Sequence, residues 1–252
     1  MFRIETRCDG AVAYVTLANP PVNVIDFQMI GEIREFLAAL RAEPRLCALV
    51  FQANGKLFSS GVDVASHLAP TVERMINEFH SVFEAVDELA VPTVAVVRGA
   101  CFGGACELAG YMDAVIATED AQFGVPEITL GVFPPVAATF FPQRFAHQTA
   151  MRMLLAGERL NVSEAVAIGL VSMVVKEEEA ATALEDLLAS FRDKSAPAIR
   201  AAKRATLRAR GAFRALVAPA EQVYLHELMT HPDAEEGLRS FIEKRPPIWT
   251  HQ

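Results

Sequence analysis

The feature that most constrains the fold is the alternation of short apolar runs with longer amphipathic segments through most of the chain. Apolar runs suited to buried strands occupy residues 11–18, 46–52, 93–99, 112–118 and 170–175. Between them, apolar residues recur at helical spacing in residues 25–43, 76–89, 147–157 and 162–170. Strands that alternate with helices favour a mainly parallel sheet, so the chain is predicted to be an α/β protein.

This alternation stops at about residue 177. Residues 178–194, 196–210 and 212–231 all show helical patterns, and no strand pattern follows them. We therefore predict two regions, an α/β core over residues 1–177 and a helical region over residues 178–252. Gly157 is expected to end one core helix, and Ser163 or Asn161 to cap the next.

Composition excludes several classes of protein. The 252 residues are 52% hydrophobic, which is enough for a large core, and the net charge of −8 argues against nucleic-acid binding. No apolar run is long enough to span a bilayer, and the N-terminus lacks the pattern of a signal peptide. The six histidines form no metal-ligand pattern, and the four cysteines suggest buried, reduced thiols. We expect a cytoplasmic protein without a metal and without membrane or nucleic-acid partners.

Three stretches carry more specific information, namely GKLFSSGVDV (55–64), ACFGGACELAG (100–110) and AQFGVPEITLGVFPP (121–135). The pair Gly103–Gly104 allows close approach of a ligand to the backbone at the start of a helix, where N–H groups lack helical partners. Val62, which follows Gly61, can supply a second N–H group. Two such donors that converge on one oxygen form an oxyanion hole.

Two glutamates lie in the second and third stretches. If Glu107 and Glu127 meet in space, they form a carboxylate pair able to move protons. Spacing alone does not bring them together: Glu107 also suits a helix dipole, and Glu127 also suits a solvated loop. His67 could line a ligand pocket near the first stretch or have a structural role.

Taken together, the three stretches resemble the enoyl-CoA hydratase/isomerase (crotonase) family. FSSGVDV (58–64) is similar to the family's first oxyanion loop, and residues 98–134 are similar to its central signature. Residues 154–175 and 236–249 extend the resemblance over nearly the whole chain. The resemblance implies a spiral of ββα units with a helical C-terminal region, assembled as a homotrimer or a homohexamer through residues 178–252.

The resemblance also implies a ligand and roles for residues. The ligand is an acyl-CoA thioester, with coenzyme A as part of the substrate and no separate cofactor. The N–H groups of Val62 and Gly104 match the oxyanion hole, and Glu107 and Glu127 match the two hydratase carboxylates. We expect Glu127 to be the principal base that activates water, with Glu107 as its partner. The remaining residues expected to contact substrate or CoA are Val22, Ser60, Gly61, Asp63, Gly103, Phe133, Pro135, Phe241 and Lys244, the last from a neighbouring subunit.

Two departures from the family pattern concern the substrate. Pro135 stands where typical hydratases have a glycine whose N–H helps to hold the water, and Ala65 replaces a frequent CoA-binding lysine. Residues 19–26, 66–80, 130–142 and 223–245 resemble the subgroup that hydrates cyclohexa-1,5-diene-1-carbonyl-CoA in aromatic degradation. We therefore expect a hydro-lyase that acts on a linear enoyl-CoA or on this cyclic dienoyl-CoA. An enoyl-CoA isomerase and a non-catalytic acyl-CoA-binding or RNA-binding member of the family are the alternatives.

Overall fold

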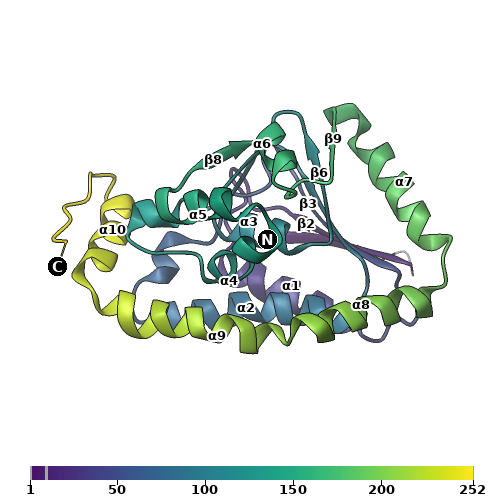
Figure 1. Cartoon of the computed structure of the whole chain (residues 1–252), viewed down its shortest axis with the longest axis horizontal. Coiled ribbons are helices and arrows are strands. Elements are labelled where there is room, and N and C mark those ends of the chain that lie inside the picture. The colour runs from purple at the N-terminus through teal and green to yellow at the C-terminus, as the bar shows by residue number, and fades with distance from the viewer. Residues whose placement is uncertain (1, 9–10, 252) are drawn as a thin grey trace.

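A computed structural model of the chain describes residues 2–8 and 11–251. Its larger sheet has six strands in the order β1-β2-β3-β4-β6-β9 (Figure 1). Only β1 pairs antiparallel with its neighbour, and the other pairs are parallel, as the alternating pattern predicts. The strands are β1 (Ile4–Cys8), β2 (Val12–Leu17), β3 (Ala48–Ala53), β4 (Thr93–Val97), β6 (Ala114–Thr118) and β9 (Met173–Val175).

A smaller sheet has three strands in the order β5-β7-β8. These are β5 (Ala100–Phe102), β7 (Gln122–Gly124) and β8 (Arg159–Asn161). The sequence analysis does not predict them, because three residues are too few to show a periodic pattern. It also misses β1, where only Ile4 is buried, because no apolar alternation marks this edge strand.

Six helices accompany the strands, and further helices follow β9. The first group is α1 (Phe27–Leu40), α2 (Val72–Leu89), α3 (Gly104–Tyr111), α4 (Pro135–Arg144), α5 (His147–Ala156) and α6 (Val162–Ala167). The second is α7 (Ala180–Arg192), α8 (Ala196–Arg210), α9 (Phe213–Gln222) and α10 (Pro232–Ile242). The change from α/β to helical structure thus falls close to the expected residue 177, while Met1 and Gln252 at the outer ends of the two predicted regions lie outside the described residues.

Local sequence explains where α5 ends and where α6 begins. Gly157 ends α5 in the left-handed conformation, with φ of 65°, which a glycine adopts without strain. Asn161 begins α6 with a capping box, because its side chain accepts the N–H of Glu164 while the Glu164 side chain accepts the N–H of Asn161. Of the two expected caps, Asn161 is therefore the one that is used.

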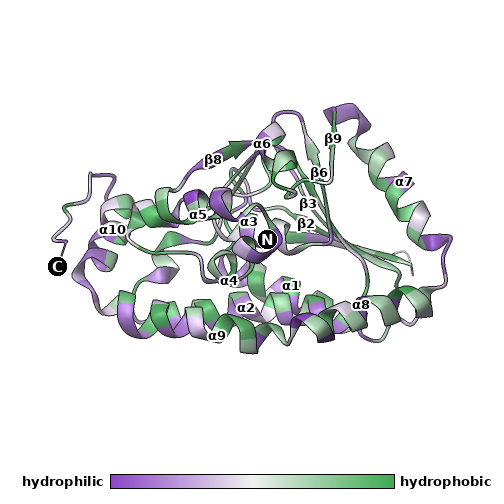
Figure 2. Cartoon of the chain, viewed as in Figure 1, coloured by the Kyte–Doolittle hydropathy of each residue, from purple (hydrophilic) through white to green (hydrophobic). Residues whose placement is uncertain are grey.

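The larger sheet is buried on both faces. Along β2, Ala13, Val15 and Leu17 point into the main core with α1 and α2, whereas Val12 and Tyr14 point to a second, smaller core. Leu184 and Leu188 of α7 cover that second core. Figure 2 shows the hydrophobic character of the strands against the mixed surfaces of the long C-terminal helices.

Helix α8 is held to the core by polar contacts, since none of its residues is buried. Arg200 donates to the backbone carbonyl groups of Glu43, Pro44 and Leu46. Near the other end of α8, Arg210 pairs with Asp87 and donates to the hydroxyl group of Tyr111, 2.6 Å away. These contacts place α9, which follows α8, against α2 beside the core.

Three of the four cysteines are buried, but Cys8 is exposed. The expectation of four buried thiols is therefore wrong for Cys8, because it lies on the edge strand β1, where Ile4 alone among the five strand residues is buried. Over residues 2–8 and 11–251, no helix is long and apolar enough to cross a membrane.

Candidate active site

The start of α3 presents a backbone N–H group to a cavity. The chain leaves β5 and turns at Gly103, whose φ of +58° suits glycine. A Cβ atom at Gly103 would lie 2.9 Å from Glu127 Oε1, so any side chain would displace that carboxylate. Gly104 is the first residue of α3, and its N–H group therefore has no partner within the helix.

A second N–H group comes from the loop that contains Val62. The N–H of Ile25 donates to the carbonyl of Gly61, at 2.9 Å, and the N–H of Asp63 donates to the carbonyl of Ile25, at 3.1 Å. These two hydrogen bonds form a short parallel β-bridge between Ile25 and Val62. In such a bridge the N–H of Val62 points away from Ile25. Buried Ser59 fixes the loop, because its hydroxyl accepts the N–H of Gly61 and donates to the carbonyl of Asn23.

The two N–H groups lie at one place because glycines allow the loops to approach closely. A Cβ atom built on Gly61 would lie 2.9 Å from the carbonyl oxygen of Phe102 and 3.5 Å from the nitrogen of Gly104. A Cβ atom on Gly104 would lie 2.6 Å from Val62 Cγ2. Neither the N–H of Val62 nor the N–H of Gly104 donates to another group in the described part of the chain. Two free donors so close together are suited to bind one anionic oxygen.

Glu107 lies one helical turn into α3 and is only 3% exposed. Its Oε1 accepts the N–H of Ala137, at 2.8 Å, from the first turn of α4. Burial raises the pKa of Glu107 to about 7, while the N–H groups of Ala137 and Val136 oppose the rise by stabilising the carboxylate. The α4 N-terminus thus favours the anionic form of this glutamate.

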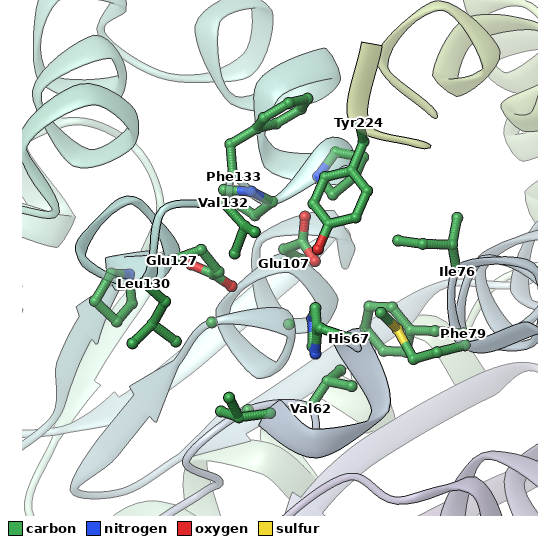
Figure 3. A pocket seen from close by; sticks show the side chains of 18 of the residues that line it. Val62, His67, Ile76, Phe79, Glu107, Glu127, Leu130, Val132, Phe133 and Tyr224 are labelled. Carbon is green, nitrogen blue, oxygen red and sulfur yellow. The ribbon is translucent and has the colours of Figure 1, made fainter. Parts of the chain in front are cut away.

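Glu127 approaches the same cavity from the short 3-10 helix Pro126–Leu130 (Figure 3). Its Oε2 is buried and has no hydrogen-bond partner among the residues that the structure describes. Burial, and then the charge of nearby Glu107, raise the pKa of Glu127 to about 8. Two backbone N–H groups of α4 stabilise the Glu107 carboxylate, whereas the Glu127 carboxylate has only its own backbone N–H group and the charge of Glu107 beside it, so a proton shared by this pair resides preferentially on Glu127.

The cavity between these groups has a volume of about 70 Å³ and a mostly apolar wall. The wall comes from α2, from the loop before it, from the segment between the 3-10 helix and α4, and from the C-terminal helices. Its apolar side chains are Val62, Val64, Met75, Ile76, Phe79, Pro126, Leu130, Val132, Phe133, Pro134, Pro135 and Leu238. Such a wall suits a hydrocarbon group placed next to the two donors and the two carboxylates.

The structure brings most of the predicted site residues together. Ser60, Gly61, Gly103, Phe133 and Pro135 line the cavity along with Val62, Gly104, Glu107 and Glu127. His67 also lines it, with Nδ1 3.0 Å from the carbonyl oxygen of Asp63, and burial lowers its pKa.

Four predicted contacts lie outside this lining. Val22 supports the loop through its carbonyl, which accepts the N–H of Ser60, and Asp63 precedes the 3-10 helix Val64–His67. Phe241 and Lys244 lie at the exposed end of α10, and Phe241 is 56% exposed. The contact of Lys244 with a neighbouring subunit's ligand stays a prediction.

Two polar residues of the cavity wall are missing from the sequence-based prediction. His80 of α2 is fully buried, with Nδ1 2.5 Å from Glu221 Oε1. Tyr224 lies just after α9, and its hydroxyl is buried. Neither His80 Nε2 nor the Tyr224 hydroxyl has a hydrogen-bond partner within residues 2–8 and 11–251. The helical pattern of residues 76–89 places His80 on the apolar face and is a signal that could have found it. Within residues 2–8 and 11–251, no cluster of three or more potential ligand side chains could hold a metal ion.

The sequence and the fold of this chain are similar to those of known proteins. The sequence pattern of the enoyl-CoA hydratase/isomerase family matches residues 7–252. A cyclohexa-1,5-dienecarbonyl-CoA hydratase of Thauera aromatica is 34% identical over 97% of this chain and 95% of its own length. A probable enoyl-CoA hydratase of Mycobacterium bovis is 31% identical over 97% of this chain and 96% of its own. The crystal structure of an enoyl-CoA hydratase from Mycobacterium avium subsp. paratuberculosis superimposes with a TM-score of 0.85 at 26% identity, covering 98% of each chain.

Proposed function

Because the chain belongs to the enoyl-CoA hydratase/isomerase family, we propose that it is a hydro-lyase that adds water to an unsaturated acyl-CoA thioester. One observation carries the proposal. Two free backbone N–H groups, of Val62 and Gly104, and two buried carboxyl groups, of Glu107 and Glu127, face one apolar cavity. Hydration of a double bond conjugated with a thioester needs this combination, since it requires an oxyanion site, a base and an acid.

In the proposed mechanism, the two N–H groups bind the thioester oxygen and draw electrons from the conjugated double bond. A water molecule attacks the β-carbon through its oxygen, and one of its protons passes to a carboxylate. The electron pair of the double bond moves onto the thioester as an enolate, which the oxyanion site stabilises. The second carboxyl group, which is protonated at the start, delivers its proton to the α-carbon, and the thioester carbonyl is restored.

Hydrogen bonding favours a particular division of labour between the glutamates. Ala137 N–H stabilises Glu107 as a carboxylate, and Glu127 lacks such a donor at Oε2. We therefore assign Glu107 as the base that activates water and Glu127 as the acid that protonates carbon. This is the reverse of the division expected from the sequence.

For the acyl group, we propose the cyclic dienoyl thioester. The Thauera aromatica relative is named for that substrate, and Phe133, Pro134 and Pro135 form a wall of the cavity in which consecutive prolines lead into α4. Val136, which the sequence pattern also suggests for this wall, is buried and does not line the cavity. A rigid wall suits a rigid ring, because neither partner loses much conformational entropy on binding. A linear enoyl-CoA is the alternative substrate.

The test compares turnover of crotonyl-CoA and cyclohexa-1,5-diene-1-carbonyl-CoA by the purified protein, with products identified by mass spectrometry. Hydration of the cyclic substrate at the higher kcat/KM is the expected result. A preference for crotonyl-CoA would remove the cyclic assignment and leave the hydratase assignment in place. A product with a shifted double bond and no added water would instead identify an isomerase. Binding of acyl-CoA without turnover, or of RNA, would indicate a non-catalytic member.

We also propose that the protein works as a homotrimer or homohexamer. Phe241, Ile242 and Ile248 expose large apolar side chains near Lys244 at the C-terminal end, where a neighbouring subunit would cover them. Sedimentation equilibrium gives the mass of the assembly, and a monomer at micromolar concentration would contradict this proposal.

A further inference from the structure

Tyr224 is a buried polar residue for which the mechanism above has no role. Its side chain is 1% exposed, and its hydroxyl has no partner in the described part of the chain. A hydroxyl group buried without a hydrogen bond costs free energy, so such groups usually have a binding partner. The hydroxyl belongs to the wall of the cavity that Glu107 and Glu127 also line.

The backbone around Tyr224 is unusual as well. At the end of α9 the helix widens into one π-helical turn, Val223–Glu227, before the chain turns toward α10. Such turns arise by insertion of a residue and are frequent at functional sites. The ring of Tyr224 packs edge-on against Phe133, with 5.4 Å between ring centroids, which fixes its direction.

The hydroxyl of Tyr224 is directed at the two carboxyl groups. Figure 3 shows it pointing from the C-terminal side of the cavity toward Glu107, with Glu127 on the opposite side. Burial, and then the charges of Glu127 and Glu107, raise the pKa of the phenol far above its usual range. Tyr224 therefore keeps its proton and can donate one hydrogen bond and accept another.

The first turn of α4 has no free N–H group for the attacking water. Pro135, the first residue of α4, has no N–H group. The next two N–H groups, of Val136 and Ala137, are directed at the Glu107 carboxylate. The first turn of α4 thus fixes the base, and the attacking water needs another partner.

We propose that Tyr224 is a third catalytic residue, whose hydroxyl binds the water molecule that attacks the β-carbon. This inference rests on the proposed hydration reaction. The water oxygen forms the new bond to carbon, one water proton passes to Glu107, and the second O–H donates a hydrogen bond to the oxygen of Tyr224. Tyr224 neither gains nor loses a proton, so the atom balance of the hydration is unchanged.

The direct test replaces Tyr224 by phenylalanine, which keeps the ring against Phe133 and removes only the hydroxyl. Hydration by Tyr224→Phe should fall roughly 10- to 100-fold in kcat, the effect of losing a hydrogen bond to a reacting group. Tyr14→Phe is the matched control, because Tyr14 lies on the far face of the larger sheet in the smaller core, and its hydration rate should equal that of the wild type.

A binding measurement separates this role from a structural one. The hydroxyl group of the product takes its oxygen from the attacking water. Tyr224→Phe should therefore bind the hydroxyacyl-CoA product roughly 2- to 10-fold more weakly by calorimetry. Its affinity for the corresponding saturated acyl-CoA, which lacks that hydroxyl, should stay the same.

The outcomes are distinct. A fall in kcat together with weaker binding of the hydroxylated ligand alone supports the proposal. Unchanged kcat, or an equal loss of affinity for both ligands, overturns it while the hydratase assignment stands. A wild-type protein that hydrates neither test substrate overturns the proposed function instead.

Discussion

Helices α3 and α4 both begin at the cavity, but their first turns use their free N–H groups in different ways. At α3, Gly103 and Gly104 leave the first N–H group unpartnered and accessible beside Val62. At α4, Pro135 removes the first N–H group, and the N–H of Ala137 donates to Glu107. The first helix start is suited to bind a ligand oxygen, and the second stabilises a protein carboxylate.

This difference shows that a helix N-terminus is not a ligand site by itself. Both helices have a dipole of the same sense and first-turn N–H groups without partners inside the helix, but the residue types in the first turn decide what these N–H groups reach. Glycine at α3 lets another loop approach to within contact distance, whereas at α4 proline removes one donor and the buried carboxylate of Glu107 accepts another. Four substitutions or measurements would break or sharpen this contrast.

The largest effect is expected from loss of the carboxylate that the first turn of α4 stabilises. Glu107→Gln keeps an oxygen for the N–H of Ala137 but cannot accept a proton from water. Hydration should fall by about 10²- to 10⁴-fold in kcat, the usual contribution of a general base. Exposed Glu158→Gln is the control and should keep the wild-type rate. A Glu107→Gln protein with nearly full activity would remove Glu107 from the mechanism.

At the α3 side, Gly104→Ala should displace the oxyanion donors. The added Cβ would lie 2.6 Å from Val62 Cγ2 and 3.0 Å from Phe79 Cζ, so the Val62 side chain must shift and press on the loop that carries its N–H group. We expect kcat to fall about 10²- to 10³-fold, as for loss of one oxyanion donor. Gly31→Ala is the control, since a Cβ at Gly31 in α1 meets nothing within 4 Å. Equal activity of the two variants would argue against an oxyanion site at Gly104.

The two carboxyl groups should give a bell-shaped pH profile. Glu107 must be ionised and has a pKa of about 7, whereas Glu127 must be protonated and has a pKa of about 8. The value of kcat/KM should be greatest between these two and fall about tenfold for each pH unit beyond either limb. Stopped-flow measurement of the loss of thioester conjugation would show this. An activity that is flat from about pH 5 to 9 would contradict the paired carboxyl groups.

The smallest effect concerns the free energy of unfolding and tests Glu127, the glutamate that the first turn of α4 does not stabilise. Folding raises the pKa of Glu127 from 4.5 to about 8, so unfolding releases a proton throughout that range. The free energy of unfolding therefore falls as pH rises from 4.5 toward 8, and Glu127→Gln removes this loss. The variant should gain on the order of 1 kcal/mol over the wild type at a pH of about 8.5 and less at about 5.5. Thermal unfolding at the two pH values measures the gain, and a variant no more stable than the wild type at the higher pH would contradict it.

Much of the fold follows from local sequence. The apolar runs predict the long parallel strands because both faces of the larger sheet are buried, and the helical period predicts α1, α2 and α5. Edge strand β1 and the three-residue strands of the smaller sheet depend on tertiary pairing, which local periodicity does not contain.

The site is less accessible to sequence reasoning. Gly103, Gly104 and Glu107 are adjacent in sequence and carry a motif, but their meeting with Glu127 and Val62 was expected from a family resemblance and not from spacing. The donor from Ala137 and the unpartnered Oε2 of Glu127 appear only when α4 and the 3-10 helix pack against α3. Tyr224 lies in a segment that resembles the cyclic-dienoyl subgroup, yet a single tyrosine in a helical pattern gives no sign that it faces glutamates more than 90 residues earlier.

The widened turn Val223–Glu227 also makes this site sensitive to insertions and deletions. In a regular helix each residue advances by about 100°, so the loss of one residue just before Tyr224 would rotate its side chain by roughly a quarter of a turn. A one-codon deletion would thus exchange the residue that faces Glu107. Gain or loss of this single residue offers a short mutational route between related enzymes that hold water differently.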